Sequence, residues 1–288
     1  MATTDIKGEY QPPPGYLGNL SSEQQSALDQ LKKELKGQKE TEFALEGEDT
    51  FVESRIGDAR LLRFLRARKF NVAASKAMWL ANEKWRKEFG VDEIVKSFDY
   101  HEKADVDKYY PQFYHKVDKD GRPLYIERLG TLDIDALYSV TTPERQLKRL
   151  VYEYEKSMTE RLPACSALVG HPVSTYCTIL DLKDVSIRSF YRVKDYVMSA
   201  ASIGQDHYPE TMGKFYIINA PFLFTGVWSV VKPWLDEVTV AKIQVLGAKN
   251  KDVLLAQIPE ENLPKSLGGS CQCSEGCSLS DAGPWNRL

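Results

Sequence analysis

The stretch YPETMGKFYIINAPFLFTGVWSVVKPWL, residues 208–235, joins a strand-like run to an unusually apolar helical segment. Eight apolar or aromatic side chains stand between residues 221 and 235: Phe222, Leu223, Phe224, Val227, Trp228, Val230, Val231 and Trp234. Four of them, at positions 224, 227, 228 and 231, fit one helical face, whereas positions 222, 223 and 230 lie off it. The segment is too short to span a bilayer, which takes ~20 apolar residues. It therefore predicts a helix that is buried in a core, docked on a membrane, or the movable wall of an apolar cavity.

The composition is that of a folded protein. The chain has 288 residues, of which 42% are hydrophobic and 27% charged, which suffices for one large α/β domain and a smaller attachment. The net charge of −3 argues against nucleic acid as the main partner, because phosphate neutralisation generally needs a basic surplus. The start of the chain lacks a signal peptide and a myristoylation site, and no prenylation motif ends it. Five cysteines, an odd number, fit a reducing compartment, so any membrane contact is expected to be peripheral.

The first third of the chain predicts an arm followed by helices. Residues 1–20, which are rich in proline, are expected to form a flexible arm. A capping box that begins at Ser21 starts the first helix. The run DARLLRFLRARKF (58–70) forms a second helix, and Asn71 caps a third. Residues 21–98 are therefore expected to form a small all-helical unit.

From residue 99 onward, strand patterns alternate with helical ones. Strands are expected at Tyr114–Val117, Leu124–Arg128, Tyr176–Leu182, Phe215–Asn219 and Lys242–Leu246. The pair Asp120-Gly121 predicts a turn between the first two strands, and Thr141 is expected to begin the capping box of the next helix. Because strands alternate with helices, the pattern predicts an α/β fold with a mostly parallel sheet covered by helices. This second domain spans residues 99–288 and includes a C-terminal tail.

Several motifs, in one order from about Ser21 onward, resemble the CRAL-TRIO family of lipid-binding proteins. They are LLRFLRARKF (61–70), EKWRK (83–87), YPETMGKFYIINAPF (208–222), KPWLD (232–236) and ENLPKSLGG (261–269). Three more segments are similar to the fungal cytosolic phosphatidylinositol/phosphatidylcholine transfer proteins: YHKVDKDGRPLYIERLG (114–130), RLPACS (161–166) and SLSDAGPW (278–285). The resemblance implies that the sheet floors a hydrophobic lipid cavity closed by a gate helix. The implied gate residues are Phe222, Phe224, Val227, Trp228, Val231 and Trp234.

The resemblance also implies two headgroup sites. For phosphoinositol it implies Arg68, Glu210, Thr239 and Lys242, with Thr239 and Lys242 near the phosphate and Arg68 paired to Glu210. For phosphocholine it implies Tyr114, Tyr125, Tyr154 and Thr178, because aromatic faces attract a quaternary ammonium. Tyr176 belongs to the same expected phosphocholine site: it stands where the family has a serine, which replaces a small hydroxyl donor by a ring that could reach the phosphate or add a fourth aromatic wall. Phosphatidylinositol is therefore the expected ligand, and phosphatidylcholine is the second candidate.

The predicted function is exchange of one phospholipid at a time with membranes, in support of phosphoinositide metabolism and Golgi vesicle traffic. The protein is expected to be a cytoplasmic monomer that touches Golgi or endosomal membranes transiently, with a bound phospholipid and no other cofactor. An alternative is a carrier of a sterol-, squalene- or tocopherol-like ligand, which would leave Arg68, Glu210 and Lys242 without a role. A scaffold or signalling module without transfer activity is a third hypothesis.

The hypotheses of an enzyme and of a metal site find little support in the sequence. Cys165, His171, Cys177 and Asp181 lack a local nucleophile signature, so no catalytic residue is expected. The tail cysteines Cys271, Cys273 and Cys277 offer three thiolates. A closed zinc site needs four ligands, and no histidine follows them. The sequence therefore predicts no metal site.

Overall fold

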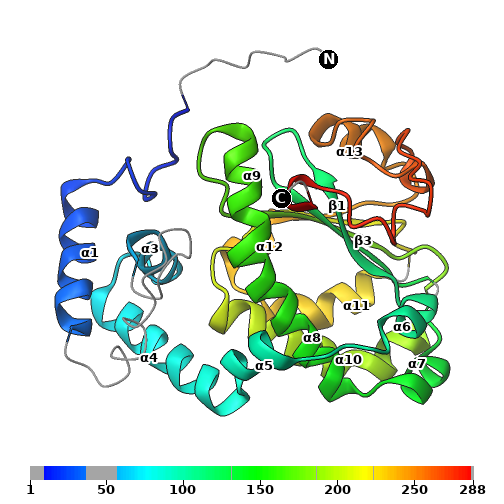
Figure 1. The fold of residues 1–288 in the computed structure, drawn as a ribbon, viewed down its shortest axis with the longest axis horizontal. Coiled ribbons are helices and arrows are strands. Elements are labelled where there is room, and N and C mark those ends of the chain that lie inside the picture. The colour runs from blue at the N-terminus through cyan, green and yellow to red at the C-terminus, as the bar shows by residue number, and fades with distance from the viewer. Residues whose placement is uncertain (1–9, 37–56, 131, 186, 223, 287–288) are drawn as a thin grey trace. The chain divides into compact units, whose positions relative to one another are not determined.

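The computed structural model of this chain describes residues 10–36, 57–130, 132–185, 187–222 and 224–286. The chain divides into two compact units, Met1–Trp85 and Arg86–Leu288 (Figure 1). The division falls in the last turns of helix α4 (Val72–Phe89), earlier than the expected boundary at residue 98.

The first unit is helical, as its sequence pattern indicates. It contains α1 (Ser22–Leu35), α3 (Asp58–Ala67) and most of α4. The predicted capping box at Ser21 is present, and Asn71 accepts a hydrogen bond from the amide of Ala74 at 2.9 Å. Burial of one apolar stripe per helix forms the core: Leu28, Leu31, Leu35, Leu61, Leu62, Phe64, Leu65 and Trp79.

Part of the expected arm is bound to this helical unit. The guanidinium of Arg66 lies 3.8 Å from the centroid of the Tyr16 ring and donates a hydrogen bond to the carbonyl of Gly15 at 3.1 Å. Residues 1–9 lie outside the described residues. The second half of the arm is therefore attached to α3 through one arginine.

The second unit alternates helices with strands. Its strands are β1 (Gln112–Val117), β2 (Pro123–Arg128), β3 (Tyr176–Asp181), β4 (Met212–Ile218) and β5 (Ile243–Val245). Its longer helices are α8 (Pro143–Lys156), α9 (Leu162–Val169), α10 (Ile187–His207) and α11 (Phe224–Val231). The shorter ones are α5 (Val91–Ser97), α6 (Lys103–Tyr109), α7 (Ile134–Val140), η1 (Ser157–Arg161), η2 (Lys232–Trp234), α12 (Glu237–Lys242), α13 (Lys251–Gln257), η3 (Lys265–Leu267) and η4 (Pro284–Asn286).

Two elements begin one residue later than predicted. Thr142 caps α8 and accepts from the amide of Arg145 at 3.2 Å, whereas Thr141 donates to Glu102. Lys242 ends α12, and the last strand begins only at Ile243. In both places, two neighbouring residues are both chemically suited to begin the element, so the sequence pattern did not distinguish between them.

The sheet is mostly parallel, as predicted. Its order is β1-β2-β3-β4-β5, and only the β1–β2 pair is antiparallel. Gly121 adopts a positive φ of 79° in the turn between these two strands, as the predicted Asp120-Gly121 turn requires. The register aligns Tyr114, Tyr125, Thr178 and Phe215 in one row across four strands.

The two faces of the sheet differ in packing. One face is a dry core against α13, formed by Leu124, Ile126, Cys177, Ile179, Tyr216 and Ile218 with Leu254 and Ile258. Of the alternate residues of these central strands, Tyr176 and Ile217 are buried, but five are only half-buried: Tyr125, Glu127, Thr178, Leu180 and Phe215. Helices α8, α10 and α11 lie on this second side of the sheet (Figure 1). The sheet face that these helices cover is therefore incompletely packed.

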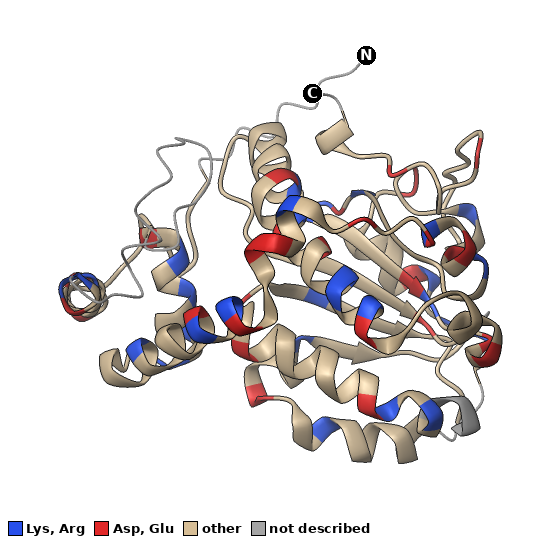
Figure 2. Cartoon of the chain, turned by 60° about the horizontal axis from the view of Figure 1, so that its bottom comes forward, with Lys and Arg blue, Asp and Glu red and all other residues tan. Residues whose placement is uncertain are grey.

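No helix of the part of the chain described here combines the length and the apolar character needed to cross a bilayer. Basic and acidic residues alternate over the helices and loops (Figure 2).

Candidate functional site

The half-buried sheet face is desolvated by the protein around it. Tyr125 and Glu127 keep accessible surface, yet desolvation by the surrounding protein raises the pKa of both side chains. Burial likewise raises the pKa of Tyr196, a half-buried residue of α10 whose phenol is electrostatically coupled to Glu127. A side chain that is desolvated but not tightly packed borders a space inside the protein. Tyr125, Glu127 and Tyr196 are the side chains that would border such a space.

Three tyrosines expected to bind choline meet at one end of this face. The rings of Tyr114 and Tyr125 lie 5.0 Å apart between centroids, and Tyr176 contacts Tyr114 edge-on at 6.4 Å. Thr178 lies beside Tyr125 in the register of β2 and β3. The row across the sheet therefore brings together residues that the sequence separates by 64 positions.

The ring of Tyr114 already has a cation on one side. The guanidinium of Arg161 lies 3.9 Å from its centroid, and Trp285 packs edge-on against it at 6.3 Å. Tyr114 is only 7% exposed, and burial raises its pKa to about 12. Tyr114 therefore supports the site from behind, and Tyr125 offers the more accessible ring. The sequence analysis missed Arg161 and Trp285, although both lie in the motifs RLPACS and SLSDAGPW.

Tyr154 reaches the same region from α8. Its ring stacks on Tyr208 with centroids 4.3 Å apart and planes 6° from parallel, so one face of the ring is covered. The side chain is half-buried, and a Cβ built on Gly204 would lie 2.9 Å from its hydroxyl. Gly204 is therefore the residue of α10 that leaves room for Tyr154.

Glu127 is a further residue that the sequence analysis missed. Its carboxylate accepts hydrogen bonds from Tyr125 at 2.7 Å, from Gln112 at 3.2 Å and from Tyr110 at 3.3 Å. These hydrogen bonds offset part of the free-energy cost of removing a carboxylate from water at this sheet face. A pattern of alternating polarity in PLYIER could have singled it out, because it shares a face with Tyr125.

Three of the four residues expected at the inositol headgroup lie in the second unit. Lys242 forms an ion pair with Glu210, with Nζ 3.5 Å from Oε2. Thr239 donates through its amide to Asp236, which caps α12, at 2.9 Å. The two expected phosphate ligands therefore both lie on the short helix α12. Glu210 has a positive φ of 58°, in the turn that leads the chain into β4. The expected pairing of Glu210 with Arg68 stays a prediction.

Arg68 belongs to the first unit. It occupies the C-cap position of α3 and donates to the carbonyl of Ala67 at 3.1 Å. Its expected role at the headgroup stays a prediction.

The segment expected to be the gate is a short, exposed, apolar helix. Phe222 is 90% exposed at its start, and Val227 is the one residue of α11 that is buried. At the other end, the side-chain amide of Gln205 in α10 accepts from the amide of Asp236 at 2.9 Å and donates to the carbonyl of Trp234 at 2.8 Å. The segment is therefore fastened at its C-terminal end and presents apolar surface at its N-terminal end.

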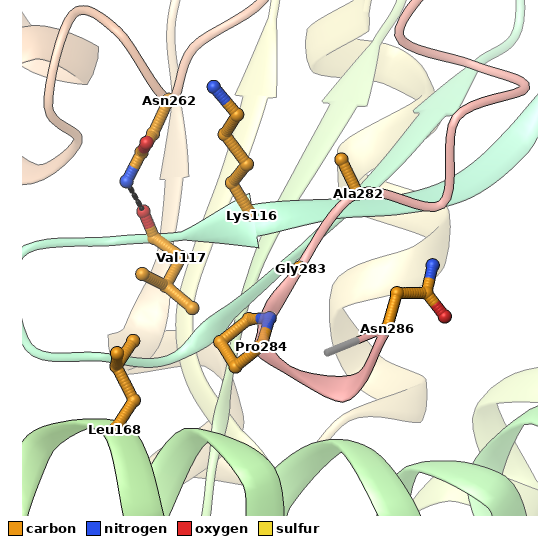
Figure 3. A pocket seen from close by; sticks show the side chains of 8 residues that line it. All are labelled: Lys116, Val117, Leu168, Asn262, Ala282, Gly283, Pro284 and Asn286. Atoms are coloured by element: carbon orange, nitrogen blue, oxygen red, sulfur yellow. Dashed lines mark hydrogen bonds between the residues drawn. The ribbon is translucent and has the colours of Figure 1, made fainter. Parts of the chain in front are cut away.

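A separate recess of about 450 Å³ lies on the outer side of β1. Lys116 and Val117 of β1, Leu168 of α9 and the tail residues Ala282, Gly283, Pro284 and Asn286 line it (Figure 3). Asn262 closes one edge by donating to the carbonyl of Val117 at 2.8 Å. The recess has no aromatic receptor for a headgroup, and its outer wall is the C-terminal tail.

The thiols weighed as nucleophiles are buried. Burial raises the pKa of Cys165 to about 12 and that of Cys177 further. Both side chains are fully inaccessible. They therefore stay protonated, which is the state of structural cysteines and not of nucleophilic ones.

A mostly parallel sheet with one packed face and one desolvated, incompletely packed face that carries Tyr125 and Thr178 is the arrangement of an α/β ligand-binding domain. A family model of the CRAL/TRIO domain matches residues 107–269, and a model of the CRAL/TRIO N-terminal domain matches residues 27–81. The chain belongs to the CRAL/TRIO family.

Relatives match nearly the whole chain. Sec14 cytosolic factor of Schizosaccharomyces pombe is 54% identical over 275 residues, which cover 96% of this chain and 92% of that protein. The phosphatidylinositol/phosphatidylcholine transfer protein SFH12 of Arabidopsis thaliana is 44% identical over 79% of this chain, which is 42% of its own length. The crystal structure of Sfh5 superimposes with a TM-score of 0.69 at 17% identity, covering 91% of this chain and 92% of that one. This last likeness concerns the fold alone.

Proposed function

We propose that the protein exchanges single phospholipid molecules with membranes, with phosphatidylinositol as its main ligand and phosphatidylcholine as a second one. The observation that carries the proposal is the sheet face of Tyr125, Glu127 and Thr178, which is desolvated but incompletely packed. The names of the relatives in Schizosaccharomyces pombe and Arabidopsis thaliana, a cytosolic factor and a phosphatidylinositol/phosphatidylcholine transfer protein, support it.

The energetics of such a ligand suit this architecture. Each methylene moved from water into the protein contributes ~0.8 kcal/mol, so two acyl chains outweigh the dehydration of one headgroup. The charged end needs a cation, which Lys242 supplies beside Glu210. A phosphate bound there would compete with Glu210 for the ammonium, so that the carboxylate could accept from inositol hydroxyls. No covalent step and no resident cofactor is required.

Exchange requires the segment from Phe222 to Trp234 to move. Apolar side chains on several sides of α11 can face acyl chains in a closed state and the bilayer interface in an open one. Gln205 would serve as the fixed end of this movement, since its two hydrogen bonds hold Trp234 and Asp236. Contact with a membrane would offset the exposure of apolar surface that opening creates. Transfer would therefore occur during transient contact of a monomer with Golgi or endosomal membranes.

Replacing Trp228 and Trp234 together by Gln is expected to lower vesicle-to-vesicle transfer of both lipids at least tenfold. The reason is that each indole contributes roughly 2 kcal/mol of favourable free energy through its contact with the membrane interface or with acyl chains. The measurement is the initial rate with labelled phosphatidylinositol and, separately, labelled phosphatidylcholine.

Leu168→Gln is the matched control, because Leu168 is an exposed apolar residue of α9 at 50% exposure, outside the proposed gate. It should change neither rate more than twofold. If the double tryptophan variant transfers lipid as fast as the control, the gate assignment is wrong.

Tyr176→Ser is expected to raise phosphatidylcholine transfer and to leave phosphatidylinositol transfer within twofold. The Tyr176 ring occupies space beside Tyr114, and a serine would return a small hydroxyl next to Thr178. The gain should be about tenfold, the value of one hydrogen bond to a charged phosphate. The two-lipid transfer assay measures both rates on the native chain and the variant.

The remaining outcomes of that assay are informative. Equal transfer of both lipids by the native chain would mean that Tyr176 is tolerated as a part of the choline site. Transfer of neither lipid would overturn the proposal in favour of a sterol-, squalene- or tocopherol-like cargo.

A further inference from the structure

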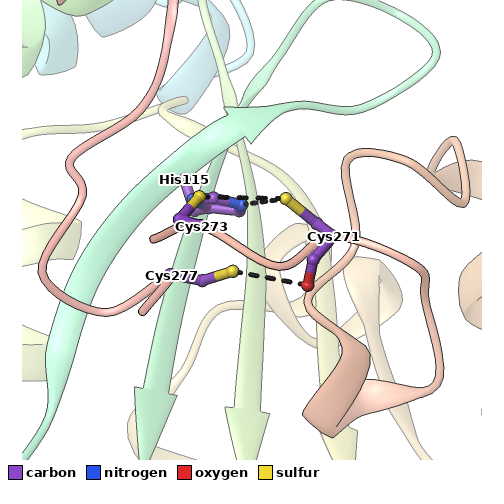
Figure 4. A group of neighbouring side chains, drawn as sticks. All are labelled: His115, Cys271, Cys273 and Cys277. Atoms are coloured by element: carbon purple, nitrogen blue, oxygen red, sulfur yellow. Dashed lines mark hydrogen bonds between the residues drawn. The ribbon is translucent and has the colours of Figure 1, made fainter. Parts of the chain in front are cut away.

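The C-terminal tail brings three thiols to one buried imidazole. The ligand atoms of His115, Cys271, Cys273 and Cys277 all lie within 4.8 Å of one another (Figure 4). His115 is fully buried on β1, Cys271 is 8% exposed, and the other two cysteines are half-buried. The histidine precedes Cys271 by 156 residues. The sequence argument against a metal site, which required a histidine after the cysteines, therefore does not hold.

Backbone interactions hold the cluster in place. Cys271 forms a parallel bridge with Pro264, and its amide donates to the carbonyl of Leu263 at 3.1 Å. Gly276, at a positive φ of 86°, closes a turn in which its amide donates to the carbonyl of Cys273 at 3.0 Å. This turn directs Cys277 back toward the first two thiols. The tail is thus built to converge on His115.

The distances suit one tetrahedral ion. Nε2 of His115 lies 3.3 Å from Sγ of Cys271, and Sγ of Cys271 lies 3.9 Å from Sγ of Cys273. A tetrahedral zinc ion with bonds of ~2.3 Å to sulfur and ~2.0 Å to nitrogen places its ligand atoms roughly 3.5–3.8 Å apart. An iron–sulfur cluster would hold its ligands farther apart, because several metal ions lie between them. Three thiolates and one imidazole are a donor set that favours zinc.

A hydroxyl orients the imidazole from the other side. Nδ1 of His115 lies 3.3 Å from Oγ of Ser280, and this hydroxyl donates to the carbonyl of Cys277 at 3.1 Å. Nδ1–H can therefore donate to Ser280, which leaves Nε2 as the ligand atom that faces the thiols. Metal-bound histidines usually have such an outer hydrogen bond, which selects the ring orientation and tautomer.

We propose that His115, Cys271, Cys273 and Cys277 bind one structural Zn²⁺ ion that fastens the C-terminal tail to the sheet. The tail beyond the cluster carries Trp285, which packs against Tyr114 and Arg161, and it forms the outer wall of the recess on β1. The ion has four protein ligands and no open position, so it has no catalytic role. Its task is to hold the support behind the aromatic headgroup residues. The inference does not depend on which lipid is carried.

The first test is the metal content of the full chain, purified without chelators and measured by inductively coupled plasma mass spectrometry. The expected result is close to one zinc per chain. Treatment with a mercurial that blocks thiols should release this zinc to a chromogenic chelator. After the zinc is exchanged for Co²⁺, the spectrum should show the intense visible bands of a tetrahedral thiolate site.

Variants locate the ion. Cys273→Ser and His115→Gln should lower the zinc content at least fivefold, whereas Cys165→Ser and Cys177→Ser, which remove thiols outside the cluster, should keep it. Removing the zinc from the native chain should speed hydrogen exchange in residues 282–286 at least tenfold and leave β3 protected. This readout needs no variant, so a variant that fails to fold does not remove the test.

Three results would overturn the proposal. The first is a native chain that contains less than a tenth of a zinc per molecule and gives no cobalt spectrum. The second is a disulfide between two of the three tail cysteines in the purified protein, and the third is zinc that persists in both cluster variants. Lipid transfer is not used in any of these measurements. The failure of the metal site and the failure of the proposed exchange function are therefore distinguishable.

Discussion

Lys242→Ala is expected to lower phosphatidylinositol transfer at least tenfold while phosphatidylcholine transfer stays within twofold. Lys242 is the cation that the structure holds beside Glu210 and one turn from Thr239. A hydrogen bond to a charged group contributes ~1.5–3 kcal/mol, and each ~1.4 kcal/mol changes an equilibrium constant tenfold. The expected phosphocholine residues Tyr114, Tyr125 and Thr178 lie on β1, β2 and β3, whereas Lys242 ends α12. The measurement is the transfer rate of each labelled lipid between vesicles.

Lys249→Ala is the matched control, because Lys249 is an exposed lysine that follows β5. Both variants should unfold at nearly the native temperature, since a partly exposed ion pair contributes less than ~1 kcal/mol. A loss caused by Lys242→Ala is then a loss of binding. Equal loss of both lipids would contradict separate headgroup sites, and no loss of either would remove Lys242 from the site. Arg68→Ala tests the corresponding prediction for the first unit by the same two rates.

Glu155→Gln is expected to lower the free energy of unfolding by about 3 kcal/mol, because the buried guanidinium of Arg86 loses its buried charged partner and keeps the exposed carboxylate of Asp92, at 3.1 Å. Arg86 donates to Glu155 through both terminal nitrogens, at 2.6 and 3.2 Å, and both residues are less than 10% exposed. Tyr208 donates to the same carboxylate at 2.7 Å. Burial alone would lower the pKa of Arg86, but Glu155 outweighs this effect and raises it.

This network joins the end of α4, helix α8 and the residue after α10, so its loss affects several elements at once. For a unit of this size, a change of about 3 kcal/mol lowers the melting temperature by roughly 10 °C. Calorimetry or urea unfolding monitored by fluorescence measures it. Glu144→Gln, which removes an exposed ion pair with Lys148 in the same helix, is the control and should cost at most ~0.5 kcal/mol.

The replacement of both charges tests the cause. Arg86→Met combined with Glu155→Leu should recover part of the stability lost in Glu155→Gln, because no charge then stays buried alone. A Glu155→Gln variant as stable as Glu144→Gln would show that the buried pair contributes nothing to folding.

Much of the fold could be predicted because the signals that decide it are local. The capping box at Ser21, the cap at Asn71 and the turn at Gly121 each depend on residues within four positions of one another. The alternation of strands and helices likewise predicted the mostly parallel sheet. The errors at Thr141 and Lys242 arose where two adjacent residues could take the same local role.

The candidate site could be predicted only as a set of residues. Motif resemblance selected Tyr125, Thr178 and Lys242, but apart from a pairing of Arg68 with Glu210 it did not state which side chains contact each other. The cation over Tyr114 is Arg161, and the partner of Lys242 is Glu210. Glu127 and Trp285 were missed for the same reason, since their roles depend on neighbours far along the chain.

By itself, the sequence determined the helices, the strands, the family and the residue types available for a lipid headgroup, because periodicity, caps and motifs act over short segments. Only the tertiary structure decided which sheet face is packed and which is only half-buried. It also decided that His115 of β1 meets three cysteines of the tail. These features depend on the path of the backbone between distant segments, which brings together side chains whose local sequences carry no record of one another.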